Sequence, residues 1–544
     1  MNLAQLKKIR VGISLLFFVL IFFLFLDFNS LFSAKFTNTV LYLQFAPSLL
    51  KFLALLSAAA IGFALIMVLS LFFGRIYCST ICPLGTFQDL ISWFSRKIAR
   101  KKSKKRKKPF LYSRPHNIIR YGILGLTILV LLSGSAFLLN LLDPFSNFGR
   151  IVTNLFKPVY MGANNLAVTV LGWFDNYSLY PVEMRTLGFA SLFFPVVILI
   201  TILVLAAWRG RLYCNTLCPV GTFLGVISRF SRYKIAISDD CNSCGLCEWN
   251  CKSECIDRDK KVVDMSRCVG CFNCFTVCNR QAMKFTKTSF SPNLSPKKLK
   301  VSELATDQTK RNFLISGLIA WAGLSGFKIR RDSLANKTDD PVKKIVATKA
   351  STVPENKKYP VTPPGSYGLM QYNDRCTACH LCVSACPTNV LQPAWLEYGL
   401  VGLWQPRMDY HSNFCNYDCQ VCTDICPSGA LLPMLIEDKK LKQLGKAKFI
   451  LENCIVETEN TDCGACSEHC PTKAVDMVPV AGKDLFIPEV TDSLCIGCGA
   501  CEYACPTIPY KAIYVEGNPV HLRAKKPKEE KLDTEVDYEE DFPF

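Results

Sequence analysis

The spacing of the cysteines restricts the fold of this 544-residue chain more than any other feature. The chain has 29 cysteines, an odd number, and most stand two or three residues apart in short runs, several ending in Cys-Pro. An odd count argues against a fully paired disulfide framework, which is typical of much shorter secreted chains. Runs of this kind are typical of iron–sulfur cluster ligands. Half of the residues are apolar, which excludes an intrinsically disordered chain.

Two runs in the middle of the chain follow the two-cluster ferredoxin pattern. In that pattern three cysteines of one run bind one [4Fe–4S] cluster, and the fourth binds the other cluster. The predicted sets are Cys241, Cys244, Cys247 with Cys278, and Cys268, Cys271, Cys274 with Cys251. Cys255 is surplus by spacing, although it could replace Cys251, because neither run ends in Cys-Pro.

Four further runs lie near the C-terminus, and each has four cysteines and ends in Cys-Pro. They are Cys376, Cys379, Cys382 and Cys386; Cys415, Cys419, Cys422 and Cys426; Cys454, Cys463, Cys466 and Cys470; and Cys495, Cys498, Cys501 and Cys505. These sixteen cysteines predict four more [4Fe–4S] clusters, six in all. Zinc ribbons use pairs of cysteines instead.

Histidines offer weaker alternatives. Cys376-Thr-Ala-Cys379-His380 also matches a haem-attachment motif, but haem there would leave the rest of that run incomplete. His411 and His469 have no partner at ligand spacing and are expected at the surface. No nucleotide-binding fingerprint, phosphate loop or catalytic triad is evident.

Hydropathy predicts four transmembrane helices. Long apolar runs cover 11–26, 52–73, 118–142 and 188–208, and about 20 apolar residues span a hydrocarbon layer of ~30 Å. Residues 96–108 carry ten basic side chains in thirteen. The positive-inside rule therefore places the N-terminus, this loop and the chain after Trp208 in the cytoplasm.

The net charge of +19 divides along the chain. Residues 1–329 carry 40 basic and 14 acidic side chains, whereas residues 330–544 carry 23 and 30. A basic half could bind nucleic acid, but the apolar runs favour a topology signal, so no nucleic acid is expected.

A fifth apolar segment, 313–327, is short for a membrane span and resembles the core of a signal peptide. Thr309-Lys310-Arg311 opens a motif similar to a twin-arginine export signal, with lysine in place of the first arginine. We favour export of the acidic half over an amphipathic or buried helix, because the charge shift begins here.

An internal repeat marks the membrane part. Residues 74–96 and 210–232 share fifteen identities in 23 positions, and each copy follows a predicted span. The repeat predicts a duplicated helix pair with its cysteines at equivalent places: Cys78, Cys82, Cys214 and Cys218. Cysteines four residues apart share one helix face, so the two pairs could hold a shared cluster or metal ion; the alternative is a structural Cys-Pro turn with inert thiols.

With these motifs in place, a resemblance can be stated. Residues 1–290 resemble the membrane quinol-dehydrogenase subunit (NapH type) of periplasmic nitrate reductase systems. Residues 305–515 resemble its four-cluster ferredoxin partner (NapG type), which is related to the methylamine-utilisation ferredoxin. The chain therefore looks like a natural fusion of two subunits. The Cys-x3-Cys-Pro repeat also occurs in a nitrous-oxide reductase accessory protein and in a cytochrome-oxidase assembly factor.

The resemblance implies a bacterial inner-membrane protein that takes electrons from quinol and passes them to an exported reductase or cytochrome, with quinol dehydrogenase activity. It also implies that the first C-terminal run pairs with the fourth and the second with the third. Two alternatives stay open: an accessory factor that reduces metal or maintains a partner, and electron exchange between a cytoplasmic ferredoxin and quinone.

We expect an α-helical membrane domain joined to α+β ferredoxin-like domains. The predicted parts are a membrane domain (1–235), a cytoplasmic two-cluster domain (236–290), a connector with a signal-anchor-like helix (291–330), a linker (331–370), a four-cluster domain (371–523) and a charged tail (524–544).

Carboxylates near the span ends are candidates for the quinone site, because charged groups close to a bilayer are often functional. The three candidates are Asp27, Asp89 and Asp143, and each could equally be an interfacial cap. Asp89 has no acidic counterpart in the other copy of the repeat, where Gly225 stands at the equivalent position. One difficulty follows from the topology: ~30 Å of hydrocarbon separates the cluster domains, and cysteines near the inner face could not bridge it alone.

Overall fold

The computed structural model describes residues 3–27, 31–55, 61–102, 110–182, 184, 188–287, 351–480, 482 and 484–526. The portions before 288 and after 350 belong to one structural unit. The apolar segment 313–327, the twin-arginine-like motif and nearly all of the charged tail lie outside the described residues.

Two helices within the described ranges are long and apolar enough to cross a membrane. They are α1 (Leu3–Leu26) and α11 (Phe189–Arg209), with apolar spans over Gln5–Leu26 and Ser191–Arg209. Both carry runs of leucine, isoleucine, valine and phenylalanine on all sides, as a helix surrounded by lipid or protein would. They correspond to the first and fourth predicted spans, so a long apolar helix is confirmed at these two places.

The second predicted span is not one helix. The chain forms α2 (Ala34–Leu41), α3 (Phe45–Leu55) and α4 (Gly62–Phe73). The ring of Phe63 lies 5.1 Å from that of Phe52, and its backbone N–H donates to Ser48 Oγ at 2.9 Å. The start of α4 therefore packs on the middle of α3, and the two helices lie side by side. Gly62 permits this approach, because a Cβ there would lie 2.0 Å from the carbonyl oxygen of Tyr42.

The third predicted span is also interrupted. Helix α7 (Asn117–Leu132) ends at a Ser-Gly-Ser turn in which Gly134 has a φ of +88°, and α8 (Phe137–Leu142) follows. Asp143 then caps α9 (Pro144–Ile151), which continues through a π-helix (Val152–Phe156) into α10 (Lys157–Gly172). Glycine at positive φ explains the break, since it adopts this conformation without steric cost.

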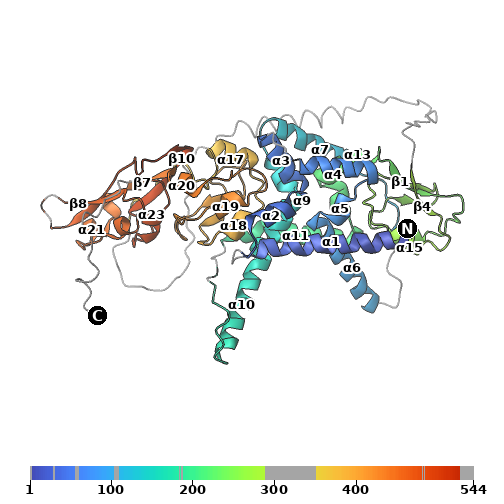
Figure 1. Cartoon of the computed structure of the whole chain (residues 1–544), viewed down its shortest axis with the longest axis horizontal. Coiled ribbons are helices and arrows are strands. Elements are labelled where there is room, and N and C mark those ends of the chain that lie inside the picture. The colour runs from blue at the N-terminus through green and yellow to red at the C-terminus, as the bar shows by residue number, and fades with distance from the viewer. Residues whose placement is uncertain are drawn as a thin grey trace, which may run out of the picture. The chain divides into compact units, whose positions relative to one another are not determined.

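Each copy of the internal repeat forms a short helix, a Cys-Pro turn and a second helix. The first copy gives α5 (Tyr77–Thr80) and α6 (Pro83–Lys102), and the second gives α12 (Leu212–Thr216) and α13 (Pro219–Ser228). Proline occupies the first position of α6 and α13, where its missing N–H costs nothing. Helices α6 and α10 extend away from the neighbouring helices (Figure 1).

The first cluster domain follows α13. Strand β1 (Tyr233–Ile237) pairs antiparallel with β4 (Met283–Lys287), with Tyr233 opposite Lys287, and β2 (Ile256–Asp257) pairs with β3 (Val262–Val263). Between them lie the single-turn helices α14 (Leu246–Trp249) and α15 (Asn273–Val277).

The second cluster domain is built from short helices and three antiparallel strand pairs. The pairs are β5 (Leu391–Pro393) with β6 (Pro406–Met408), β7 (Lys442–Phe449) with β10 (Ile513–Arg523), and β8 (Val475–Pro479) with β9 (Phe486–Val490). The helices are α17 (Leu369–Arg375), α18 (Leu381–Ala385), α19 (Val421–Asp424), α20 (Ile436–Lys440), α21 (Ile455–Thr458), α22 (Ala465–Glu468) and α23 (Ala500–Ala504).

Residues 351–370, expected to be part of a linker, pack on this second domain. Glu355 Oε1 accepts from the backbone N–H of Lys511 at 2.9 Å, and the Tyr359 carbonyl accepts from Gly517 at 3.0 Å. Val361 is buried, and its carbonyl accepts from Met408. The proline-rich composition suggested an extended segment, and the segment is extended, but its backbone hydrogen bonds are made to the domain.

Candidate iron–sulfur sites and the repeat cysteines

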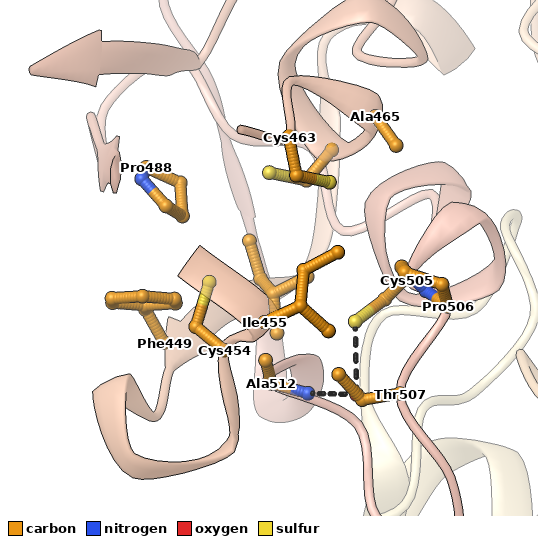
Figure 2. Close-up of a pocket in the computed structure, with 12 residues that line it drawn as sticks. Phe449, Cys454, Ile455, Cys463, Ala465, Pro488, Cys505, Pro506, Thr507 and Ala512 are labelled. Atoms are coloured by element: carbon orange, nitrogen blue, oxygen red, sulfur yellow. Dashed lines mark hydrogen bonds between the residues drawn. The ribbon is translucent and has the colours of Figure 1, made fainter. Parts of the chain in front are cut away.

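All 29 cysteines lie in the described residues, and none forms a disulfide. The most clearly formed site is a cavity in the second cluster domain whose wall includes Cys454, Cys463, Cys466 and Cys505 (Figure 2). The rest of the wall is mostly apolar, with Phe449 and Ile455 among its residues. Four thiols around one apolar cavity are the donor set of a [4Fe–4S] cluster, so the residues fit that group.

The runs of the second domain pair differently from the expectation. Cys382 lies near enough to Cys426 for electrostatic interaction, and Cys422 is similarly close to Cys386. In the other half, Cys466 interacts with Cys505, and Cys501 with Cys470. The first run therefore exchanges its last cysteine with the second run, and the third with the fourth. The expected pairing of first with fourth and second with third is wrong, because neighbouring runs fold together as local pairs.

The resulting sets are Cys376, Cys379, Cys382 with Cys426; Cys415, Cys419, Cys422 with Cys386; Cys495, Cys498, Cys501 with Cys470; and Cys454, Cys463, Cys466 with Cys505.

A hydroxyl two residues after each Cys-Pro cysteine was not singled out from the sequence. Cys505 Sγ lies 3.2 Å from Thr507 Oγ1, and the equivalent distance is 3.7 Å in the other three runs, to Thr388, Ser428 and Thr472. Backbone N–H groups also face these sulfurs, as between Ala474 and Cys470 at 3.2 Å. Such hydrogen bonds stabilise a thiolate and tune the potential of a bound cluster. The Cys-Pro-Thr/Ser tripeptide, repeated at the end of all four runs, was the signal available in the sequence.

In the first cluster domain Cys274 interacts with Cys271, Cys268, Cys251 and also Cys247, which places the two predicted sets next to one another. Cys251 Sγ and Cys255 Sγ are 3.5 Å apart, and both are buried. The structure thus brings both candidate ligands to the second set, and the choice between them stays a prediction.

The four cysteines of the internal repeat converge. Cys78, Cys82, Cys214 and Cys218 are all buried within one hydrophobic cluster. Cys218 is near enough to the other three for electrostatic interaction. Within the described ranges, no three of these thiols come within 4.8 Å of one another, which is wider than four thiolates around a single zinc ion at ~2.3 Å would be.

The two copies of the repeat hold one another by exchanged arginines. Arg75 Nη2 donates to the carbonyl oxygen of Cys214 at 3.0 Å, and Arg211 Nη1 donates to that of Cys78 at 2.5 Å. Gly85 and Gly221 allow these contacts, because a Cβ at either would lie 2.7 Å from the arginine of the other copy. The pseudo-twofold arrangement expected from the repeat is present in these contacts.

Arg75 is the more unusual of the two. It is fully buried, and among the described residues no carboxylate lies within ion-pair distance of it. Its Nη2 lies 3.9 Å from Cys78 Sγ. A buried, unpaired charge is costly, and thiolates on a bound cluster would supply the missing negative charge.

The three carboxylates predicted for a quinone site occupy separate structural roles. Asp27 accepts from the backbone of Leu31 and Phe32 after α1, and Asp143 accepts from Ser146 as the cap of α9. Asp89 is a buried hub that pairs with three cations: Arg211 at 2.9 Å, Lys252 at 3.3 Å and Arg10 at 3.4 Å. Its counterpart Gly225 instead packs on the carbonyl of Ser266, which explains the asymmetry of the repeat.

Short contacts link the repeat cysteines to both cluster domains. Arg75 donates both to Cys214 O in the repeat and to Ser266 O in the first cluster domain, the latter at 3.0 Å. The arginine is thereby close enough to Cys268 of that domain for electrostatic interaction. On the other side, Gly149 of α9 packs against the carbonyl of Cys379; a Cβ there would lie 2.3 Å from it. Helix α9 also reaches the repeat, since Asn147 Nδ2 donates to Tyr213 Oη at 3.0 Å.

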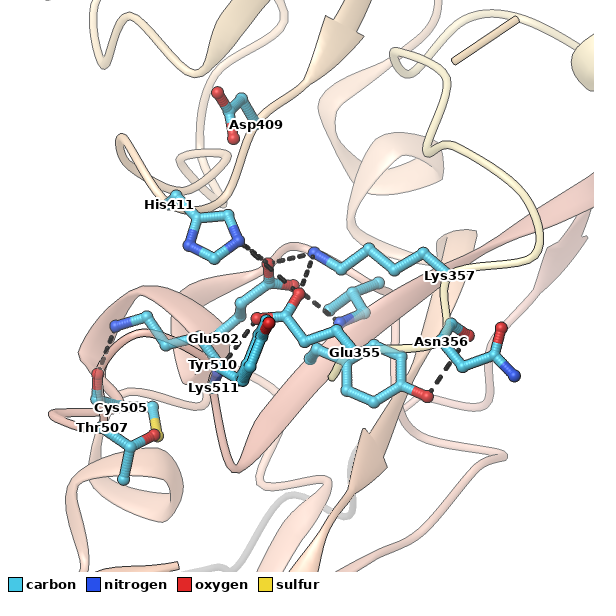
Figure 3. Close-up of polar contacts among 12 residues, drawn as sticks. Glu355, Asn356, Lys357, Asp409, His411, Glu502, Cys505, Thr507, Tyr510 and Lys511 are labelled. Carbon is cyan, nitrogen blue, oxygen red and sulfur yellow. Dashed lines mark hydrogen bonds and ion pairs between the residues drawn. The ribbon is translucent and has the colours of Figure 1, made fainter. Parts of the chain in front are cut away.

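A cluster of charged groups in the second domain brings together Glu355, Lys357, His411 and Glu502 (Figure 3). The oxygen and nitrogen atoms of the two glutamates and His411 lie within 4.8 Å of one another, a geometry that could suit a metal ion. Lys357 Nζ, however, already pairs with Glu502 and with Glu355 at 3.1 Å. We therefore assign a structural role that fixes residues 355–357 to α23. His411, expected at the surface, is half exposed.

Comparison with known proteins supports iron–sulfur binding by this chain. A family model described as a 4Fe–4S binding domain matches residues 56–102 and 191–238, and one described as a 4Fe–4S dicluster domain matches 374–430 and 461–508. The first match of the dicluster model contains the first and second C-terminal runs, and its second match contains the third and fourth runs except for Cys454. No solved structure matches the chain.

Relatives cover different portions of the chain. An uncharacterized protein of Methanocaldococcus jannaschii is 26% identical over 221 residues, 41% of this chain and 76% of that protein. The methylamine utilization ferredoxin-type protein MauM of Methylophilus methylotrophus is 32% identical over 147 residues, 25% of this chain and 61% of its own length. The candidate electron transport protein YccM of Escherichia coli is 29% identical over 227 residues, 41% of this chain and 54% of its own. The cysteine sets and these likenesses identify the chain as an iron–sulfur electron-transfer protein with ferredoxin-type relatives.

Proposed function

We propose that the protein is embedded in the membrane and passes electrons between the quinone pool and a redox partner protein on the outer side. Six [4Fe–4S] clusters and a further centre on the four repeat cysteines would carry single electrons when bound. The observation that supports this best is a series of contacts between the cysteine sets. The two sets of the first domain adjoin, Arg75 of the repeat lies close to Cys268, and α9, which contacts the repeat, packs on the carbonyl of Cys379. In the second domain the backbone N–H of Cys415 donates to the carbonyl of Cys498 at 3.0 Å.

The ends of α1 support placement of the two cluster domains on opposite sides of a membrane. Near its start, Lys7 Nζ donates to Thr276 Oγ1 of the first cluster domain at 3.3 Å. Near its end, the carbonyl of Phe25 accepts from Ser384 Oγ of the second domain at 2.6 Å. Eighteen helical residues span about 27 Å, close to the hydrocarbon thickness of ~30 Å.

Helix α11 runs from the second cluster domain to the first, opposite to α1, and supports the same placement of the two domains. Phe194 near its start stacks on Trp404 of the second domain, with ring centroids 3.7 Å apart. Arg209 at its end pairs with Glu254 of the first domain at 3.4 Å. Both long apolar helices therefore have one cluster domain at each end, which agrees with export of the acidic half.

The repeat cysteines offer an answer to the difficulty of crossing the membrane. They lie between Cys268 and Cys379, with Arg75 on one side and α9 on the other. Oxidation of one quinol releases two electrons and two protons; the electrons would leave one at a time along the cysteine sets, and the protons would pass to water.

Iron content tests the centre on the repeat. The full-length protein, purified under anaerobic conditions, should hold about 28 iron atoms with seven clusters. The double variant C82S/C218S should lose about four of them and keep the ferredoxin signals. Equal iron in both proteins would contradict the seventh centre.

Quinol reactivity tests the function itself. In lipid nanodiscs, a menaquinol analogue should bleach the cluster absorbance, whereas the oxidised quinone should not. Bleaching by dithionite alone, with no response to quinol, would favour the accessory role.

A reporter fused after Phe544 tests topology. Activity of a periplasmic enzyme reporter is expected. Fluorescence of a cytoplasmic reporter would instead support the alternative in which a cytoplasmic ferredoxin exchanges electrons with quinone.

A further inference from the structure

A cavity of about 230 Å³ lies where α10 and the π-helix meet the second cluster domain. Its wall combines Pro158 and Met161 of α10 with Val383 of α18, and polar groups come from Thr153, Lys157 and Asn389. This volume lies below the usual range for small-molecule sites, ~300–1,000 Å³, but an apolar wall with a few polar groups is their usual composition.

One polar group in this wall lacks a partner. Thr153 is 4% exposed, and its Oγ1 is buried with no hydrogen bond to any described residue. A threonine in a helix ordinarily bonds the carbonyl one turn earlier. The π-helix over Val152–Phe156 alters that geometry, and single π-turns are frequent at functional sites. A buried hydroxyl without a partner costs free energy, which a ligand oxygen in the cavity would recover.

The cavity adjoins the cysteine sets. Val383 stands between Cys382 and Cys386, which belong to different sets. A neighbouring cavity shares Lys157, Met161 and Asn389 and includes Cys386 itself in its wall. A ligand here would lie next to groups that exchange single electrons, so its chemistry should be redox chemistry.

The surroundings favour a lipid-soluble ligand. On α10, beside Pro158 and Met161, Val159 is 70% exposed and Leu166 is 67% exposed. Helix α10 extends away from its neighbours (Figure 1), and Trp173 and Phe174 at its far end are also exposed. Apolar residues with aromatic side chains at the helix end are typical of contact with the membrane interface.

We propose that this cavity binds the ring of a quinone. The inference rests on the proposed function and locates its substrate site. An apolar ring that carries two oxygen atoms suits the wall, and the hydroxyl of Thr153 and the amide of Asn389 are the groups that would bond those oxygens. Lys157 Nζ donates to the carbonyl and hydroxyl of Ser384 and thereby holds α18 against α10, so it is a positioning residue.

Photolabelling tests the location directly. The full-length protein in nanodiscs is irradiated with an azido-quinone, and labelled peptides are identified by mass spectrometry. The label is expected on peptides that contain Met161 or Val383, and excess unlabelled menaquinone should suppress it. Labelling only elsewhere would overturn the proposal.

Two variants and a control make the test independent of quinol activity. M161W should fill the cavity and reduce labelling at least tenfold, and V159W, on the exposed side of the same helix, should leave it unchanged. T153V preserves the shape and should weaken menaquinone competition about fivefold, the loss of one hydrogen bond. Unchanged labelling and competition in both M161W and T153V would refute quinone binding in this cavity, even if quinol still bleaches the wild-type clusters. Wild-type clusters that ignore quinol would instead refute the proposed function.

Discussion

At the scale of single residues, buried charges near the repeat cysteines have the clearest consequences. Arg75 faces Cys78 Sγ and Cys214 O without a carboxylate partner, whereas Arg211 in the other copy is paired with Asp89. The two arginines are equivalent in sequence but differ in charge balance. Comparison of the two copies in sequence shows that Asp89 has no acidic counterpart. It does not show that Arg75 is therefore buried without a carboxylate partner.

R75Q should lower the reduction potential of the centre on the repeat by roughly tens of millivolts. Removal of a nearby positive charge disfavours the reduced state, which carries one more negative charge. A redox titration followed by EPR spectroscopy measures the change. R120Q is the control, because Arg120 bonds Ser266 but no repeat cysteine. An equal shift in both variants would contradict a specific role for Arg75.

The ion-pair cluster of Glu355, Lys357, His411 and Glu502 predicts a pH dependence of stability. Burial would raise the pKa of Glu355, but hydrogen bonds from His411 and the Lys511 backbone, with the charge of Lys357, lower it to about 2. Its contribution is therefore present above its ordinary pKa of 4.5 and is lost as the pH falls toward 2. The hydrogen bond to Glu355 raises the pKa of His411 against the effect of burial, so that contribution is present below pH ~6.5 and is lost as the pH rises through the raised value.

E355Q in the full-length protein should therefore lower the melting temperature of the second cluster domain by about 2–4 °C at pH 6. The difference from wild type should shrink as the pH falls below about 4. Differential scanning calorimetry across this range measures both effects. E457Q, whose carboxylate lies on a different helix (α21), is the control; a difference that does not change with pH would contradict the assignment.

At the scale of elements, the hairpin of α3 and α4 depends on one glycine. G62A would force a Cβ to within 2.0 Å of the Tyr42 carbonyl, and a rigid backbone cannot yield cheaply. We expect a loss of a few kcal/mol of stability, seen as a low yield of folded protein. G122A in α7 is the matched control, since nothing lies within 4 Å of its Cβ; it should be neutral or slightly stabilising. Equal yields would contradict the packing of α4 on α3.

The pairing of cysteine runs is testable at the same scale. In C426S, a native alkylation experiment should label Cys376, Cys379 and Cys382, because they lose their fourth ligand. If the second run paired with the third instead, the label would appear on Cys454, Cys463 and Cys466. Peptide mass spectrometry distinguishes the two outcomes.

For the molecule as a whole, the ligand runs, the duplicated Cys-Pro motif and two long apolar helices were predictable from the sequence, because each is a local pattern. The fourth ligand of each set in the second cluster domain was not, since spacing within a run fixes only three ligands. The breaks near Gly62 and Gly134 were missed because hydropathy averages over single glycines. The cavity between Thr153 and Val383 joins residues more than 200 positions apart, so no local pattern indicates it.

Helix α1 is held at both ends, by Thr276 near Lys7 and by Ser384 near Phe25. A helix fixed in this way cannot tilt freely to match a bilayer of different thickness. With the membrane placement proposed above, lipid in thicker bilayers would have to deform around the protein, or the contacts at one end of α1 would have to loosen. Electron transfer should therefore depend on the acyl chain length of the host lipid, with an optimum near the length that α1 itself spans.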